Sequence, residues 1–184
     1  MKNIRVARRY ATALMAAAES AKGLESVTRD LAMMETLIRS SRELRQFLDS
    51  PVIPTEKKHA VFQEILGAHV GTLTMEFIRL LTSRGRESIL PDVIEQFGVL
   101  HDDRLGIVNV DVTSAVTVSK DQETSLTGRL EAYTKKRVRM RFTLDKAIRG
   151  GLIVRIGDTV LDASVRRQLE LLKERFVHGG SANN

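Results

Sequence analysis

The sequence predicts a mainly α-helical protein with α+β character, in which an N-terminal six-helix bundle is followed by a smaller C-terminal α/β domain. Three observations support this fold class. The first 105 residues contain six amphipathic segments with helical spacing, joined by two to five residues. From Gly106 the apolar residues alternate, as in a half-exposed strand. Aromatic residues make up only 4% of the chain, and its apolar content, mainly Leu, Val, Ile, Ala and Met, favours helices.

Three helices are expected before residue 50. The first begins near Val6 and ends at Gly23, the second covers residues 24–39, and the third covers residues 42–48. Pro51 interrupts the third helix because proline disfavours the helical conformation of the residue before it. The apolar stripe of the first helix is expected to contain Val6, Tyr10, Ala13, Leu14 and Ala17. This helix is also rich in alanine, which would let another helix approach closely.

Three more helices are expected up to residue 103. Pro54 and Glu56 suit the first turn of a fourth helix that Gly67 closes. A fifth covers residues 72–83, and a sixth covers residues 86–103 with Pro91 near its first turn or at a kink. The core face of the fourth helix is expected to contain Ala60, Val61, Ile65 and Leu66, and that of the fifth Leu73, Phe77, Leu80 and Leu81.

The remaining residues predict strands and helices in alternation. Residues 107–112 form a strand, and Ser119 caps a helix that runs to about residue 135, with Gln122 or Glu123 completing a capping box. The next strand alternates Arg137, Arg139 and Arg141 with Val138, Met140 and Phe142, so one face is basic and the other apolar. Strands at residues 152–156 and 159–161 and a helix at residues 165–177 follow, and residues 179–184 are expected to be a flexible tail.

Composition excludes several classes of protein. The chain has no cysteine, which excludes disulfides, thiolate zinc sites, iron–sulfur clusters and a thiol nucleophile. No apolar run approaches the roughly 20 residues that span a bilayer, and neither a signal peptide nor a transit peptide is evident. Residues 1–105 carry 15 basic and 14 acidic side chains, whereas residues 106–184 carry 14 and 9. The second part therefore favours an acidic partner.

No catalytic, cofactor or metal site is predicted. The four histidines lack the spacing of a helical metal pair, and no phosphate-binding glycine loop is present. Asp158 and Asp162 suggest an acid/base pair or a cation site, but turn formation and helix capping explain them better.

A basic run over residues 135–149 is the strongest electrostatic feature and has three interpretations. It contains Lys135, Lys136, Arg137, Arg139, Arg141, Lys146 and Arg149. A solvated strand face and a docking surface for an acidic protein segment are both consistent with it. A nucleic-acid-binding patch is the third interpretation, although no platform of aromatic residues accompanies the charges.

The order and spacing of several motifs resemble the delta subunit of the bacterial F-type ATP synthase, the oligomycin-sensitivity-conferring protein family. The N-terminal part of the resemblance lies in residues 7–14, 50–57 and 77–86. The most specific part is Asp145, Ile148, Gly150-Gly151-Leu152-Ile153-Val154-Arg155-Ile156-Gly157-Asp158, Asp162-Ala163-Ser164-Val165-Arg166 and Leu169. Arg149 departs from the family, in which a small or apolar residue often precedes the glycine pair.

The resemblance implies a non-catalytic stator subunit, without a cofactor, in a proton-translocating ATP synthase. Residues 1–105 would bind the N-terminal helix of alpha subunits of the catalytic head, with beta subunits as a further contact. Residues 106–178 would bind peripheral-stalk b subunits. The protein would lie peripherally at the cytoplasmic face of the bacterial inner membrane, contacting the membrane only through the complex. The alternative function is a basic nucleic-acid-binding module, and a small-molecule enzyme is a more distant one.

The resemblance also suggests which residues bind each partner. The head-binding groove between the first and fifth helices would contain Tyr10, Leu14, Phe77 and Leu81. The basic strand face of Arg137, Arg139 and Arg141 is the candidate surface for the stalk.

Overall fold

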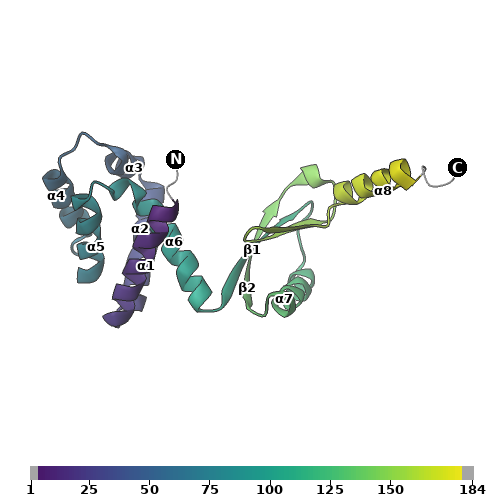
Figure 1. Cartoon of the computed structure of the whole chain (residues 1–184), viewed down its shortest axis with the longest axis horizontal. Helices are drawn as coiled ribbons and strands as arrows, with labels where there is room; N and C mark the ends of the chain where they lie inside the picture. Colours follow the sequence, from purple (N-terminus) through teal and green to yellow (C-terminus); the bar gives the residue numbers. More distant parts are fainter. Residues whose placement is uncertain (1–3, 180–184) are drawn as a thin grey trace. The chain divides into compact units, whose positions relative to one another are not determined.

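The computed structural model describes residues 4–179 and divides the chain into two compact units, Met1–His101 and Asp102–Asn184 (Figure 1). Its mixture of helices with one small sheet confirms the predicted α+β class. The contacts divide the chain four residues before the domain boundary predicted from the sequence. The tail predicted for residues 179–184 lies outside the described residues, except that Gly179 is the last residue of a helix.

The first unit is built from helices. They are α1 (Ile4–Ser20), α2 (Leu24–Ser40), α3 (Arg42–Asp49), α4 (Thr55–Leu66), α5 (Thr72–Ser83) and α6 (Leu90–Arg104), with the 3₁₀ turn η1 (Glu87–Ile89) before α6. Pro91 therefore lies in the first turn of α6, where its missing N–H removes no helical hydrogen bond. All six helices contribute to one cluster of buried apolar side chains.

The buried face of α1 differs from the predicted stripe. Ala13 and Ala17 are exposed, whereas Ala7, Ala11 and Ala18 are completely buried. The alanines of α1 thus fall into two sets. The buried alanines let α1 pack closely against its own unit, and the exposed alanines leave the opposite side of the helix without bulky side chains.

Two other predicted faces also need correction. In α4, Phe62 and Leu66 are buried but Ile65 is 41% exposed, and in α5 Leu80 is 46% exposed. Helical spacing alone can place the predicted buried face one residue away from the true one. Packing against the neighbouring helices decides which apolar residues are buried.

Two buried polar contacts join distant parts of the first unit. The Asp30 carboxylate in α2 accepts hydrogen bonds from the Gly71 N–H at 2.9 Å and from the Thr74 hydroxyl at 2.6 Å, so it caps the start of α5. Lys58 in α4 is 2% exposed, forms an ion pair with Glu87 of η1 and donates to the Ser50 carbonyl at 2.6 Å. Helical spacing predicts neither contact because each joins residues on different elements.

The second unit is an α/β fold. Its elements are β1 (Ile107–Ser114), α7 (Lys120–Thr134), β2 (Arg137–Leu144), the 3₁₀ turn η2 (Lys146–Ile148), β3 (Leu152–Ile156), β4 (Thr159–Asp162) and α8 (Val165–Gly179). The strand order is β2-β1-β3-β4, with β1 and β2 parallel and the other pairs antiparallel. The parallel pair is joined through α7, which Ser119 and Gln122 start with the predicted capping box.

The sheet of the second unit has two different faces. One face and α7 contribute the buried side chains of Val110, Val112, Leu130 and Val154. Arg137, Arg139 and Arg141 are exposed on β2, while Val138 and Met140 between them are half-buried. The predicted division of this strand into a basic and an apolar face is therefore confirmed for residues 137–141, whereas Phe142, predicted on the apolar face, is 37% exposed.

Within residues 4–179, no helix is both long and apolar enough to cross a membrane. Nor do the described side chains bring together three or more histidine, aspartate or glutamate residues as metal ligands.

Candidate protein-binding surfaces

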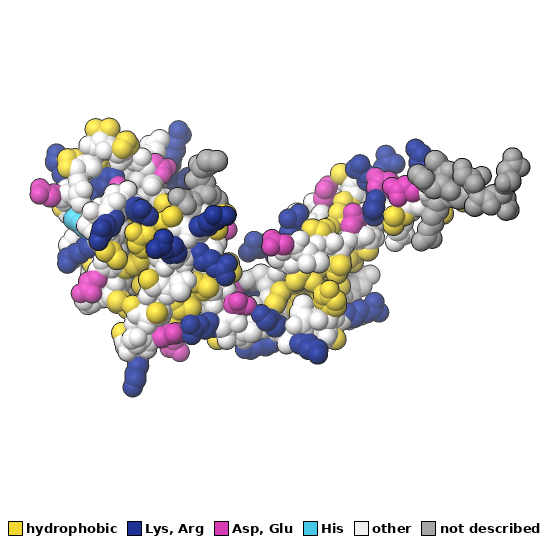
Figure 2. Space-filling view, in the orientation of Figure 1, with side chains coloured by type: hydrophobic (Ala, Val, Ile, Leu, Met, Phe, Trp, Pro, Cys, Tyr) yellow, Lys and Arg dark blue, Asp and Glu magenta, His cyan; other side chains and the backbone are white. Residues whose placement is uncertain are grey.

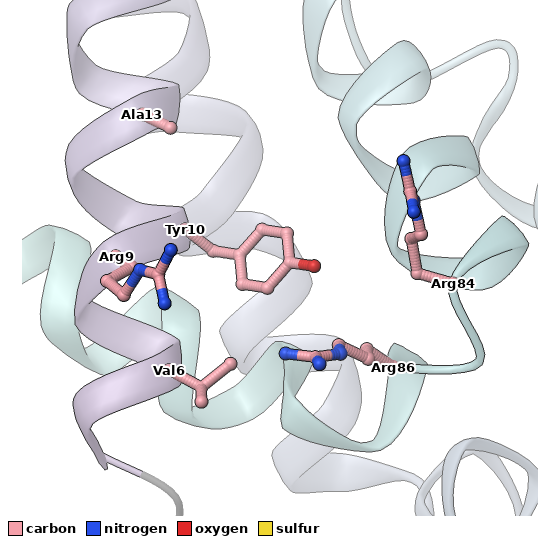
Figure 3. A pocket seen from close by; sticks show the side chains of 6 residues that line it. All are labelled: Val6, Arg9, Tyr10, Ala13, Arg84 and Arg86. Atoms are coloured by element: carbon pink, nitrogen blue, oxygen red, sulfur yellow. The ribbon is translucent and has the colours of Figure 1, made fainter.

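A hollow of about 590 Å³ lies beside α1 on the first unit (Figure 3). Its lining residues are Val6, Arg9, Tyr10, Ala13, Arg84 and Arg86. The first four belong to α1, and the last two follow the end of α5. Apolar side chains thus line the hollow together with three guanidinium groups, and these lining residues include no carboxylate.

The Tyr10 ring is the central aromatic group of the hollow. It packs edge-to-face with the ring of Phe77, with centroids 6.3 Å apart and an interplanar angle of 71°. The Arg86 guanidinium lies 5.9 Å from the Tyr10 ring centroid, within the range of a cation–π interaction. In Figure 3 the ring points from α1 across the hollow toward the segment that bears both arginines. Tyr10 therefore connects the buried core to the charged rim.

The turn after α5 places Arg84 and Arg86 at the rim. Gly85 has a φ of +61°, a left-handed conformation that costs glycine little. The turn is closed by the Arg86 N–H, which donates to the Leu81 carbonyl at 2.9 Å. A glycine between two arginines at a helix end is a local signal that would have identified this rim from the sequence.

The predicted groove residues divide into one accessible residue and three core residues. Tyr10 is half-buried, whereas Leu14, Phe77 and Leu81 are 2%, 7% and 1% exposed. The structure brings all four together, because Tyr10 packs against the cluster that contains the other three. The three core residues lie beneath the hollow, and the accessible surface here consists of the residues that line it.

A second hollow, of about 640 Å³, continues along the outer side of α1. It is lined by Arg5, Arg8, Arg9, Thr12, Ala13 and Ala16. Figure 2 shows dark blue basic side chains interleaved with yellow apolar ones over the part of the first unit where Figure 1 places α1. The two hollows share Arg9 and Ala13, so they form one continuous basic and apolar surface.

The candidate stalk surface on β2 uses part of its positive charge within its own unit. The Arg139 guanidinium bonds to both carboxylate oxygens of Asp102 at 3.0 Å, and the Arg137 guanidinium donates to the Leu105 carbonyl at 3.5 Å. Arg141 lies in register with Asp111 of β1 and makes no hydrogen bond or ion pair with a described residue. Of the three, Arg141 is therefore the arginine most available to a partner.

Asp162 has a structural role at the start of α8. Its carboxylate accepts the Ser164 N–H at 2.9 Å, and the Ser164 hydroxyl in turn accepts the Arg167 N–H at 3.2 Å. Hydrogen bonds from the Ser164 hydroxyl and then its N–H lower the pKa of Asp162, with smaller contributions from Arg167 and Arg166. The capping interpretation is therefore confirmed.

Comparison with known proteins relates this chain to one family. The family model described as ATP synthase delta (OSCP) subunit matches residues 6–176. The protein named ATP synthase subunit delta from Chlorobium phaeobacteroides is 41% identical over 177 residues, covering 96% of this chain and 98% of the relative. Its namesake from Chlorobaculum parvum is 42% identical with the same coverage.

A solved structure has a similar fold. One chain in the cryo-EM structure of the Toxoplasma gondii mitochondrial ATP synthase hexamer matches 93% of this chain and 97% of its own length. The TM-score is 0.71 and the sequence identity is 21%. The fold is thus shared across a large sequence distance.

Proposed function

The chain belongs to the ATP synthase delta (OSCP) subunit family, and on this premise we propose that it is the stator subunit that joins the catalytic head of a proton-translocating F-type ATP synthase to the peripheral stalk. It is a non-catalytic subunit, so its contribution is mechanical. By holding the head against the stalk, it lets rotation of the central shaft change the catalytic sites instead of turning the whole head. The observation that carries the proposal is the family match over residues 6–176, which includes both units. The match supports this stator role and not the nucleic-acid alternative.

The two units divide the work. In this proposal residues 1–105 act as a six-helix bundle that binds the N-terminal helix of alpha subunits, and residues 106–178 bind the b subunits of the stalk. The protein is held at the cytoplasmic face of the bacterial inner membrane through these partners. A tagged pull-down from gently solubilised native membranes, followed by mass spectrometry, tests the whole proposal. Head and stalk subunits in a fixed ratio would support it, whereas nucleic acid or an unrelated acidic protein would overturn it.

The hollow beside α1 is the proposed head contact. Val6, Ala13 and the Tyr10 ring offer apolar surface, while Arg9 and the arginines after α5 offer charge. An amphipathic helix fits this combination when its apolar side faces α1 and a carboxylate reaches the guanidinium groups.

A matched pair of substitutions on α1 tests the head contact. Ala13→Gln fills the hollow, whereas Ala17→Gln places the same side chain one turn farther along, on an exposed residue that does not line the hollow. We expect Ala13→Gln to weaken binding of the full chain to the purified catalytic head by about tenfold or more, and Ala17→Gln to leave it unchanged. Equal affinities for both variants would remove the hollow as the contact. Leu14→Asp is a poor test because a charge at a buried position disrupts folding.

Charge reversal tests the stalk contact on β2. The triple variant Arg137→Glu/Arg139→Glu/Arg141→Glu should lower the affinity of the full chain for the purified stalk, and the loss should shrink as salt is added. Arg139→Ala is the control for folding, because it removes the internal pair with Asp102 without adding negative charge. Unchanged stalk affinity in the triple variant would remove this face from the interface.

A further inference from the structure

Strand β2 is an outer strand of the sheet, and the direction of its backbone groups can be assigned. The order β2-β1-β3-β4 gives β2 a neighbouring strand on one side only. At the start of β2 the Arg137 N–H donates to the Gly106 carbonyl at 2.9 Å, and just after its end the Asp145 N–H donates to the Ser114 carbonyl at 2.9 Å. Because N–H groups alternate in direction along a strand, those of the odd-numbered residues point toward β1 and those of the even-numbered residues point outward.

The first outward N–H is covered by the protein itself, and the next three are not. The Val138 N–H donates to the Glu131 carboxylate of α7 at 3.2 Å. The N–H groups of Met140, Phe142 and Leu144 point the same way and donate to no described residue. We call these three residues, with their outward backbone groups, the β2 edge. Such a row of free donors and acceptors is a template for an additional strand.

The two outer strands of the sheet differ in length. Strand β4 has 4 residues, and a short outer strand offers little backbone to a further strand. Strand β2 has 8 residues and no proline. The β2 edge is therefore the side on which this sheet can be extended.

The side chains beside the β2 edge indicate the chemistry of the added strand. Phe142 and Leu144 follow the half-buried Met140 on one face, and they are 37% and 58% exposed. The other face carries Arg139 and Arg141, and Arg141 makes no hydrogen bond or ion pair with a described residue. An added strand would thus meet apolar surface on one face and positive charge on the other, so a complementary segment alternates apolar with acidic residues.

The same side chains argue against a second copy of β2 as the occupant. If the two sheets joined with the same faces on one side, arginines would lie beside arginines, and like charges on neighbouring strands are destabilising. If one sheet were inverted, arginines would lie beside Phe142 and Leu144. The arginines therefore oppose pairing with a second copy and leave the edge open to an acidic strand.

We propose that the β2 edge binds an extended segment of another chain as an additional strand, and that aspartate or glutamate alternates with apolar residues in this segment. Backbone hydrogen bonds to Met140, Phe142 and Leu144 supply the pairing, and the two faces of β2 supply the selectivity. The inference goes beyond the proposed function, because it assigns the backbone of β2 and not only its arginine side chains.

Hydrogen exchange resolved at single amides tests the pairing in the full chain. The probe is a capped synthetic peptide in which glutamate alternates with valine, long enough to pair with residues 138–144. With the peptide at about ten times its dissociation constant, exchange at Met140, Phe142 and Leu144 should slow by about tenfold. Exchange at Arg141 and Thr143, whose N–H groups already face β1, should change little. Docking through side chains alone would not produce this alternation.

Two substitutions of one exposed residue separate the backbone from the side chain. Phe142→Ala and Phe142→Pro both remove the ring, but only proline removes the outward N–H, and an outer strand tolerates proline where its N–H faces solvent. We expect Phe142→Ala to keep the slowed exchange at Met140 and Leu144 at a higher peptide concentration, and Phe142→Pro to lose it. Unchanged exchange at Thr143 without peptide shows that the β1–β2 pairing is intact in both variants.

Reversing one charge tests the selectivity. A second peptide, with lysine in place of glutamate, should bind the wild type at least tenfold more weakly than the glutamate peptide. Arg141→Glu should narrow this difference, and added salt should narrow it in the wild type.

Three results would overturn the proposal. The first is equal binding of the glutamate and lysine peptides to the wild type. The second is binding of the glutamate peptide without slowed exchange at Met140, Phe142 and Leu144, which would assign the contact to side chains. The third is slowed exchange at these residues that grows with protein concentration in the absence of peptide, which would identify a second copy as the occupant.

Discussion

In the first unit, helices α1 to α6 all contribute to one buried apolar cluster, whereas the cluster described for the second unit contains Val110, Val112, Leu130 and Val154. In the second unit, Val165, Leu169, Leu172 and Phe176 of α8 are 40%, 57%, 48% and 74% exposed. The first unit therefore gathers side chains from every one of its helices into one core, with the hollow beside α1 at its surface. The second unit has a smaller core and a helix whose apolar side chains stay exposed. This difference implies that partner binding should change the stability of the second unit more than that of the first.

The largest effect is expected inside the first unit, where no partner can compensate. Lys58→Met leaves the Glu87 carboxylate buried at 8% exposure without its cation, so we expect the free energy of unfolding to fall by about 3–5 kcal/mol. Urea unfolding of the full chain, monitored by hydrogen exchange in α4 and η1, measures this loss in the free energy of unfolding.

The double variant Lys58→Met/Glu87→Leu is the control for this pair. It leaves neither charge buried, so it should recover most of the stability that Lys58→Met loses. A loss below about 1 kcal/mol in the single variant would instead mean that the pair behaves like a solvated surface ion pair.

The next effect tests the comparison directly. With the purified stalk at about 100 times its dissociation constant, the free energy of unfolding of the second unit should rise by about 2.7 kcal/mol. Hydrogen exchange should slow in β1, β3 and α8 while α2 and α5 are unchanged. The purified head should protect the first unit instead. Equal protection of both units by the stalk alone would contradict the division of work between them.

Much of the fold could be predicted because its signals are local. The Ser119–Gln122 capping box, the position of Pro91 and the alternation along β2 each depend on residues close together in sequence. The faces of the helices were less predictable. Spacing alone could not decide between Ala13 and Ala7 on α1, because the choice depends on which helices pack against it.

The candidate surfaces were predicted only in part. The resemblance predicts a head contact between the first and fifth helices, but three of the four residues predicted for it belong to the buried core. Apolar residues give the strongest pattern in the sequence, but folding buries them. The pattern therefore marks the core and not the accessible surface. The contact between Arg139 and Asp102 was also missed because it joins residues 37 positions apart.

The smallest effect concerns the turn that holds α8 on the sheet of the second unit. Hydrogen bonds from Ser164 lower the pKa of Asp162, so its carboxylate favours the folded state above the ordinary pKa of 3.8, and this contribution is lost as the pH falls through the lower folded value. Asp162→Asn keeps an acceptor for the Ser164 N–H but removes the charge. It should therefore lower the thermal midpoint of the second unit slightly at neutral pH.

The pH dependence of that difference separates charge from shape. As the pH falls below the lowered pKa of Asp162, its carboxylate becomes protonated in the wild type, so the midpoints of wild type and Asp162→Asn should converge. Asp158→Asn is the matched control in the neighbouring β3–β4 turn, because Asp158 makes no hydrogen bond or ion pair with a described residue, and it should not alter the midpoint at either pH. A difference between wild type and Asp162→Asn that stays constant with pH would mean that the geometry of the turn, and not its charge, fixes α8 to the sheet.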